Sequence, residues 1–546
     1  MLRRSWLLLA AVVGFVPAAR ADVKVHPIFS DHMVLQRDID LVVWGTADAG
    51  EKVSAELFNG KAAVAKGEAT ADDKGNWAVT LPKGAKPGTG FALTVKGKNE
   101  VAFKDVAVGD VWLCSGQSNM EWKLSQLNKE DKAKGTTATQ GADTAKKALN
   151  GNIRLFTVPN KPMFEPQGTF AVSATEGQWL ECKPETVINF SAVGYYFGRD
   201  IQATQNVPVG LISSDWGGTI CEAWCSRGAL DAVPELKYFH ENLDKSIKTF
   251  DPKKADEDFK KATEKYDADM VKWKEAADKA KADGKPAPMQ PRKPVKATQQ
   301  PGGPNVPSVL YNGMIAPITR FKIKGALWYQ GESNASRAAE YYTLFPTMIS
   351  DWRKQWGYDF PFFVVQLAPF QNGNSALAQY AEVRDAQFQA SKKLKHVGYA
   401  TLSDIGNETD IHPQAKEPVG QRLALAARAI AYGEKIEWSG PVYKGMKADG
   451  AKVVLTFDHV GKGLECKGDT LTGFTVCGED MKFVPAEAKI VGDTVEVTAK
   501  GVDKPKAVRF GWVNFAKPDL NFGNKDGLPA VPFRTDDFPL TTLPKK

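Results

Sequence analysis

Hydrophobic and polar residues alternate along residues 22–108, and this pattern predicts short antiparallel strands. Apolar residues recur at every second position in "LVVWG", "VSAELF", "NWAVTL" and "FALTVKG", and Gly, Asp and Lys separate these runs. Alternation of this kind buries one face of a strand and leaves the other in solvent. We therefore expect an N-terminal β-sandwich domain over residues 22–108.

From residue 109 to residue 433 the pattern changes to continuous apolar runs separated by segments with helical spacing. The runs are "VWLCS", "VGLISS", "GALWYQ", "FFVVQL" and "VGYATLSD", each bounded by polar or small residues. Runs of this kind are typical of parallel strands buried on both faces. They predict an α/β domain of three layers, α/β/α, which ends with the helix "VGQRLALAARAIAYG" before Gly433.

Two further regions complete the predicted organisation. Alternation returns in "KVVLTF", "GFTVCG", "TVEVTA" and "AVRFGWV", which predicts a C-terminal β-sandwich-like domain over residues 434–546. Residues 229–306 are rich in Lys, Asp, Glu and Ala and then in Pro, so we expect a surface insertion of two charged helices and a loop. Two interpretations of this insertion stay open: a solvated hairpin without a chemical role, or a lid or partner arm.

Residues 1–21 have the pattern of a secretory signal peptide. Arg3 and Arg4 precede an apolar run over residues 6–16, and small residues follow up to Ala21. We expect cleavage after Ala21 and a secreted or periplasmic protein. The apolar run is too short to cross a bilayer core of about 30 Å, and no later segment is apolar enough, so we expect no membrane span.

Composition and charge narrow the function classes. A chain of 546 residues exceeds what one hydrophobic core supports, which agrees with several domains. The formal net charge is +7, but Lys residues are interleaved with Asp and Glu, so no nucleic-acid partner is expected. Cys466 and Cys477 lie at hairpin distance and are the best candidates for a disulfide. Cys221 and Cys225 have no second Cys or His pair nearby, so no metal site is expected.

Candidate chemistry lies just beyond the apolar runs, because ligands bind at the carboxyl ends of strands in open α/β sheets. Ser118 follows "VWLCSG" in a strand-to-helix turn, where a serine is either a helix cap or a nucleophile. Met120 replaces the last glycine of G-x-S-x-G, so this turn is not the nucleophile elbow of α/β-hydrolases. His412 follows the run "VGYATLSD" on the same edge, and we expect it to be the base for Ser118.

Two other strand ends carry polar or flexible residues. The turn "DWGGT" contains Gly217 and Gly218, whose backbone N–H groups can approach a ligand closely, although paired glycines are also common in plain turns. The turn "WYQGESNAS" contains Gln330, Glu332 and Asn334 directly after an apolar run. Solubility alone does not explain this concentration of polar side chains.

Several ordered blocks resemble those of a known family. In order, "CSGQSNMEW", "SSDWGGTICEAW", "LYNGMIAP", "GALWYQGESNA" and "DIHP" resemble the sialate O-acetylesterases, a branch of the SGNH hydrolase superfamily, and "FSDHMVLQR" resembles the start of bacterial members. The resemblance implies an SGNH-hydrolase-like core and a serine esterase without a metal or other cofactor. Its substrate would be an O-acetylated carbohydrate, foremost O-acetylated sialic acid, cleaved through an acetyl-enzyme intermediate.

The resemblance also implies residue roles. Ser118 would be the nucleophile and His412 the base. The backbone N–H groups of Ser118 and Gly218 and the side chain of Gln330 would form the oxyanion hole. Gln117, Asn119 and Asn334 are the residues expected at the substrate-binding mouth of the pocket.

The third member of the catalytic group stays open. The superfamily places an Asp three residues before the histidine, but this position is Thr409 here. Asp410 is one residue closer to the histidine, and Glu332 is the other carboxylate that the family pattern offers. Either would orient the imidazole and stabilise its charged form.

Two other functions compete with sialate deacetylation. The same core could deacetylate xylan or another polysaccharide, because the loops set the choice of sugar. A non-catalytic carbohydrate-binding protein is the other alternative, with some of the fourteen tryptophans as sugar platforms. The sequence leaves the oligomeric state open.

Overall fold

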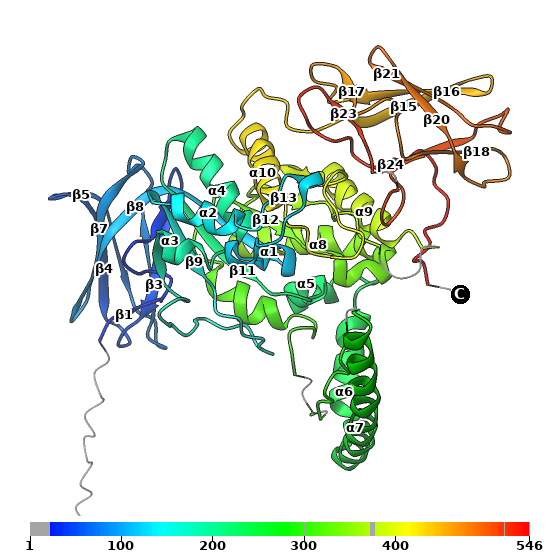
Figure 1. Ribbon diagram of the computed structural model, residues 1–546. Helices are drawn as coiled ribbons and strands as arrows, with labels where there is room; N and C mark the ends of the chain where they lie inside the picture. The colour runs from blue at the N-terminus through cyan, green and yellow to red at the C-terminus, as the bar shows by residue number, and fades with distance from the viewer. Residues whose placement is uncertain are drawn as a thin grey trace, which may run out of the picture.

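The computed structural model describes residues 22–284, 287–296, 298–299, 302–371, 377–517 and 519–544. A central α/β region lies between two β-rich regions, one formed by each end of the chain (Figure 1). The predicted signal peptide, residues 1–21, lies outside the described residues. No helix in the described part of the chain combines the length and the apolar character needed to cross a membrane.

The central sheet has the strand order β10-β9-β11-β8-β12-β13-β14. All neighbours are parallel except β10, which runs antiparallel to β9 at one edge. The strands are β8 (Glu100–Gly116), β9 (Asn150–Thr157), β10 (Trp179–Cys182), β11 (Val209–Asp215), β12 (Gly325–Tyr329), β13 (Phe362–Val365) and β14 (Val397–Ala400). The five predicted apolar runs form β8, β11, β12, β13 and β14. The sequence did not predict β9, whose apolar stretch is only "IRLF".

Helices cover both faces of this sheet. On one face α4 (Ala192–Gln205) packs against α10 (Lys416–Ala431), and on the other α8 (Ala338–Trp356) packs against α9 (Gln379–Lys393). The neighbouring residues Trp112 and Leu113 of β8 point to opposite faces and belong to separate hydrophobic cores. The predicted three-layer α/β/α fold class is therefore confirmed. The shorter helices are α1 (Ser118–Glu121), α2 (Gln140–Lys147), α3 (Pro184–Val187) and α5 (Arg227–Asp231).

The N-terminal region consists of two sheets that share a hydrophobic core. One sheet contains β1 (Lys24–Val25), β3 (Leu41–Thr46) and β6 (Asn76–Leu81); the other contains β2 (Val34–Gln36), β4 (Lys52–Asn59), β5 (Ala62–Thr70) and β7 (Gly88–Lys96), together with the first half of β8. Because β8 continues from this region into the central sheet, the boundary predicted at residues 108–109 falls inside one strand.

A buried carboxylate joins the N-terminal and central regions. Asp110, in the middle of β8, is fully buried and accepts two hydrogen bonds from the Arg37 guanidinium, at 2.9 and 3.0 Å. It also accepts a hydrogen bond of 2.9 Å from Tyr432, which follows α10. One side chain therefore ties the end of β2, the central strand and the last turn of a covering helix together.

The C-terminal region is built from three small sheets around its own core. Its strands are β15 (Val442–Asp449), β16 (Lys452–Asp458), β17 (Leu464–Cys466), β18 (Phe474–Cys477), β19 (Val484–Pro485), β20 (Glu487–Val491), β21 (Thr494–Thr498), β22 (Ala507–Phe510), β23 (Phe522–Asn524) and β24 (Phe533–Arg534). Cys466 lies in the sheet of β17 and β23, whereas Cys477 lies in that of β18 and β22. Both are free thiols, so the predicted disulfide is wrong: spacing suited a hairpin, but the two strands do not pair.

The charged insertion forms a helical hairpin. Helix α6 (Tyr238–Lys248) is followed by the long helix α7 (Pro252–Ala282), as the sequence predicted. Within α7 only Ala255 is buried, and the hairpin extends away from the body of the protein (Figure 1). These features favour a solvated hairpin over a lid.

The junction at Asp110 gives a stability prediction. Asp110→Ala leaves the Arg37 guanidinium without its buried partner, and the loss of one member of such a pair costs about 3–5 kcal/mol. We expect a lower urea midpoint, measured by tryptophan fluorescence. The control is Lys66→Met, which breaks an exposed ion pair with Glu56 and is expected to leave the midpoint unchanged. Equal midpoints for the two variants would show that the junction does not depend on this carboxylate.

Candidate active site

Ser118 stands at the carboxyl end of β8, after a turn that only glycine permits. Gly116 has a φ of 139°, and a Cβ atom there would lie 2.2 Å from the carbonyl oxygen of Tyr329 in β12. The next residue, Gln117, donates its backbone N–H to the same oxygen at 3.0 Å. The chain therefore leaves the sheet sharply, and α1 begins with a half-buried Ser118 at the edge of the sheet.

His412 lies in the loop between β14 and α10 and reaches the same edge. Its Nε2 is 2.9 Å from Ser118 Oγ, although the two residues are 294 positions apart in the sequence. The ring of Trp122 packs beside the imidazole, with 4.6 Å between the ring centroids. The structure thus brings together the two residues that the sequence selected as a hydroxyl and its base, at hydrogen-bonding distance.

The surroundings of His412 favour its neutral form. Burial lowers the pKa of His412, and the ammonium of Lys416 lowers it further. Asp410 acts in the opposite direction, and Lys129 adds a smaller lowering effect. A neutral imidazole can accept a proton from the serine, so this environment suits a general base.

Of the two candidate carboxylates, Asp410 is the one beside the imidazole. Its Oδ1 lies 3.8 Å from His412 Nδ1 and accepts the backbone N–H of His412 at 3.0 Å. Its Oδ2 accepts a hydrogen bond of 2.9 Å from Lys129. Partial burial acts to raise the pKa of Asp410, but the hydrogen bonds from Lys129 and the His412 backbone outweigh burial and lower it. Asp410 therefore stays ionised.

Glu332 has a different neighbour. It follows β12 in the turn "QGES", and its Oε1 accepts a hydrogen bond of 2.6 Å from Asn119 Nδ2. Burial raises the pKa of Glu332, while the hydrogen bond from Asn119 and the charge of Lys416 oppose this rise. Glu332 thus belongs to a cluster of polar side chains behind the serine turn, whereas Asp410 lies beside the imidazole.

The glycine turn after β11 lies against the serine. The backbone N–H of Gly217 donates to Glu121 Oε2 at 2.7 Å, and a Cβ atom on Gly217 would lie 3.2 Å from Ser118 Cβ. Gly218 is exposed and has a φ of 73°, a conformation that suits glycine. In the described part of the chain, the backbone N–H groups of Ser118 and Gly218 have no hydrogen-bond acceptor.

Gln330 does not have the free donor that its expected role requires. Its side chain is fully buried, and Nε2 donates to the carbonyl oxygen of Thr219 at 3.1 Å and to Asn334 Oδ1 at 2.6 Å. Its Oε1 accepts a hydrogen bond of 2.8 Å from Tyr341. Both amide hydrogens are used inside the protein, so the structure does not place Gln330 in an oxyanion hole.

The three residues expected to contact substrate are buried as well. Gln117, Asn119 and Asn334 expose 3%, 1% and 1% of their surface, which leaves no area for a sugar. The amide of Gln117 lies against the turn after β12, and Asn334 bonds to Glu222 Oε2 at 2.9 Å. These amides fasten the turns of the site to one another. Amide side chains are common in sugar-binding pockets, but the sequence could not show that these three point into the protein interior.

A polar hollow of about 220 Å³ opens beside His412. Lys129 and Lys134, from the segment between α1 and α2, form one part of its walls, and Asp410 and Gln414, from the loop that contains His412, form another. The two lysines already have partners, since Lys129 pairs with Asp410 and Lys134 pairs with Asp519 at 2.7 Å. His412 lines this hollow, so the hollow offers space for part of a substrate beside the imidazole.

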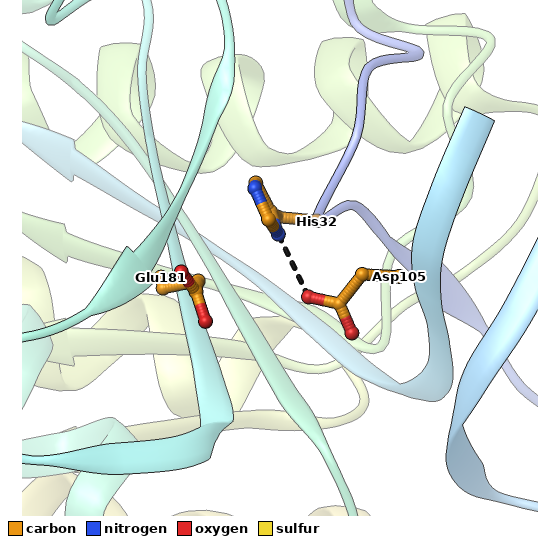
Figure 2. A group of neighbouring side chains, drawn as sticks. All are labelled: His32, Asp105 and Glu181. Atoms are coloured by element: carbon orange, nitrogen blue, oxygen red, sulfur yellow. Dashed lines mark hydrogen bonds and ion pairs between the residues drawn. The ribbon is translucent and has the colours of Figure 1, made fainter.

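One group of side chains elsewhere has the composition of a metal site. His32, Asp105 and Glu181 come from three segments, and their ligand atoms lie within 4.8 Å of one another (Figure 2). His32 Nδ1 is 2.7 Å from Asp105 Oδ2, which also accepts a hydrogen bond of 3.1 Å from Arg154. Lys183 pairs with Glu181 at 2.6 Å. Because Arg154 and Lys183 already neutralise the two carboxylates, we assign this group to ion pairing. It lies roughly 35 Å along β8 from the serine turn.

The fold and the site together define a class of protein. In this α/β/α fold, a serine hydroxyl lies at hydrogen-bonding distance from an imidazole at the carboxyl ends of the parallel strands. A carboxylate lies beside the imidazole. This arrangement belongs to hydrolases that act on carboxylic esters and related acyl groups.

Comparisons with known proteins identify the family. Residues 300–429 match the family described as carbohydrate esterase, sialic acid-specific acetylesterase. The sialate O-acetylesterase of Mus musculus is 29% identical over 546 residues, covering 92% of each chain, and that of Homo sapiens is 27% identical over 571 residues, covering 97% of this chain and 94% of the relative.

A solved structure agrees over almost the whole length. The crystal structure of a carbohydrate acetylesterase from Xanthomonas citri has 34% identity and a TM-score of 0.75, and the match covers 95% of this chain and 100% of that one. The chain therefore belongs to the sialate O-acetylesterase family of carbohydrate esterases, and it is a carboxylic ester hydrolase. The predicted membership of the sialate O-acetylesterase family is confirmed.

The contact between Gly217 and the serine gives a prediction for activity. Gly217→Ala adds a methyl group 2.9 Å from Glu121 Oε2 and 3.2 Å from Ser118 Cβ, so the Glu121 carboxylate must move and the turn or the serine must shift slightly. A displacement of about 1 Å can cost about 100-fold in rate, so for this smaller shift we expect kcat on p-nitrophenyl acetate to fall by less than about 100-fold but measurably. The control is Gly228→Ala, where the added methyl group meets open space and the rate should not change. An unchanged rate in Gly217→Ala would show that the position of this turn does not affect catalysis.

Proposed function

We propose that this protein removes O-acetyl groups from sugars by a serine mechanism, with O-acetylated sialic acids as the main substrates. The observation that carries the proposal is the distance of 2.9 Å between Ser118 Oγ and His412 Nε2. The family supplies the substrate class, because its described members are carbohydrate and sialate acetylesterases. The apolar N-terminal segment supports export from the cytoplasm as part of the same proposal.

In the proposed reaction Ser118 Oγ attacks the acetyl carbonyl carbon while His412 Nε2 takes the hydroxyl proton. The tetrahedral intermediate then collapses, and the imidazolium gives its proton to the departing sugar oxygen. Water, activated by the same imidazole, hydrolyses the acetyl-enzyme to acetate and restores the serine. General base catalysis of this kind typically contributes about 10²–10⁴-fold.

We assign the oxyanion hole to the backbone N–H groups of Ser118 and Gly218. Support comes from the contact of the Gly217–Gly218 turn with the serine and from the lack of other acceptors for these two N–H groups in the described part of the chain. One such donor contributes about 10²–10³-fold. The sugar moiety would occupy the polar hollow beside His412.

One alternative substrate remains as an outcome of experiment. A neutral acetylated polysaccharide such as xylan fits the same acyl chemistry, since both lysines of the hollow are already paired with carboxylates. The other alternative, a non-catalytic carbohydrate-binding protein, is wrong, because the chain belongs to a family of carboxylic ester hydrolases.

The nucleophile is tested with Ser118→Ala. Loss of the attacking oxygen should lower kcat by about 10⁴-fold or more while the circular dichroism spectrum stays unchanged. Acetate release is measured on p-nitrophenyl acetate, O-acetylated sialic acid and acetylated xylan. Ser125→Ala removes an exposed hydroxyl in the same segment and serves as the control. A near wild-type rate in Ser118→Ala would refute the serine mechanism, and preference for xylan would move the substrate to neutral polysaccharides.

The orienting carboxylate is tested with a matched pair of amides. Asp410→Asn removes the charge beside His412 Nδ1, and we expect kcat to fall about 100-fold because the imidazolium loses its stabilising partner. Glu332→Gln keeps an acceptor for Asn119 and should cost less than about 10-fold, since its carboxylate lies behind the serine turn. The reverse order of the two losses would transfer the orienting role to Glu332.

A further inference from the structure

Lys416 is a fully buried lysine to which the proposed mechanism gives no task. It is the first residue of α10, four positions after His412, and exposes 0% of its surface. Its ammonium donates a hydrogen bond to Asn119 Oδ1. Lysine is almost never fully buried unless it is paired, because removing its charge from water is costly.

The hydrogen-bond partner of this ammonium is the sequence neighbour of the serine, and it contacts the sequence neighbour of the histidine. Asn119 follows Ser118, and its Nδ2 donates both to Glu332 Oε1 at 2.6 Å and to the carbonyl oxygen of Ile411 at 3.1 Å. Ile411 precedes His412. One asparagine therefore connects the serine turn with the histidine loop, and the buried lysine fixes the orientation of that asparagine.

Aromatic rings enclose the same charge. The Lys416 Nζ atom lies 5.2 Å from the ring centroid of Trp122 and 5.3 Å from that of Tyr329. Trp122 is also the ring that packs on the imidazole of His412. Ring faces attract a cation and exclude water, so the ammonium acts on its surroundings with little screening.

We propose that Lys416 is a positioning residue for ester hydrolysis: through Asn119 it holds the serine turn against the histidine loop, and its charge keeps the His412 imidazole neutral. The inference rests on the proposed function, in which His412 is the general base. In this proposal Glu332 also has a role: its carboxylate is the buried counter-charge of Lys416.

The charges around the imidazole agree in sign with this role. Lys416 and Lys129 disfavour protonation of His412, whereas Asp410 favours it. Burial lowers the pKa of Lys416 to about 7, against the attraction of Glu332 and Asp410. Below that pH Lys416 carries its charge, and this is the range in which His412 would otherwise gain a proton. The lysine therefore extends the range of active enzyme toward acidic pH.

The test is the pH profile of kcat/KM for Lys416→Met, which keeps the apolar stem and removes the charge. The acidic limb should move to higher pH, because His412 then gains a proton more easily. The rate at the optimum should fall by up to about 100-fold as the two turns lose their link. A lower rate with an unshifted acidic limb would mean that Lys416 has only a structural role, and would overturn its electrostatic part.

A second variant tests whether the effects of Lys416→Met result from destabilisation of the fold. Lys416→Met leaves Glu332 buried without its cation, so the double variant Lys416→Met/Glu332→Gln removes both charges together. We expect the double variant to regain stability but to keep the shifted acidic limb. A return to the wild-type limb would contradict the proposal.

Two controls separate this inference from the proposed function. Lys322→Met removes a partly buried lysine that precedes β12, at the amino ends of the parallel strands, with its Nζ atom 4.9 Å from the ring centroid of Tyr358; its profile should match the wild type. Ser118→Ala is measured in parallel. If Ser118→Ala stays active, the proposed function fails. If it is inactive and Lys416→Met has the wild-type acidic limb, only the electrostatic role of Lys416 fails.

Discussion

The register of β8 between its two parallel neighbours is the constraint on which the site depends. It sets Gly116 opposite both Asp215 of β11 and Tyr329 of β12, so all three strands end at one level. The three turns that follow must then share a small space. Gly116 meets this demand because any side chain there would collide with the backbone of β12. The chain therefore leaves the sheet at Gly116, and Ser118 lies half-buried at the carboxyl ends of these strands.

Buried amide and charged side chains behind the serine connect these adjacent turns and fix their relative positions. The amide of Gln330 joins the turns after β11 and β12 through Thr219 and Asn334, and Asn119 joins the serine turn to the histidine loop. Every one of these amides is satisfied inside the protein, and such networks specify one arrangement of the segments that they connect. The polar residues of the family motifs thus act mainly as supports, while the surface that we propose for substrate is small: the serine, the histidine, the exposed glycine and the hollow beside the histidine.

The sequence predicted the two residues that we propose to react better than the residues that hold them in place. Ser118 and His412 follow strand ends, and the position of a strand end is visible in the local hydrophobic pattern. Gln330, Asn119 and Asn334 follow strand ends too, yet they point inward, because their direction depends on partners that are up to about 300 residues away in the sequence. Lys416 carried no distinguishing signal, since a lysine at the start of a helix normally lies in solvent.

The sequence alone determined the three-layer fold class and selected Ser118 and His412, the pair that lies at hydrogen-bonding distance, because periodicity and strand ends are local properties of the chain. It could not decide whether Asp410 or Glu332 faces the imidazole, whether Cys466 meets Cys477, or that "IRLF" forms a sixth parallel strand. Each of these depends on which segments pack together, and that is settled by burial and hydrogen bonding summed over the whole molecule. Tertiary structure therefore decided how the hydroxyl of Ser118 and the imidazole of His412 are oriented, supported and charged.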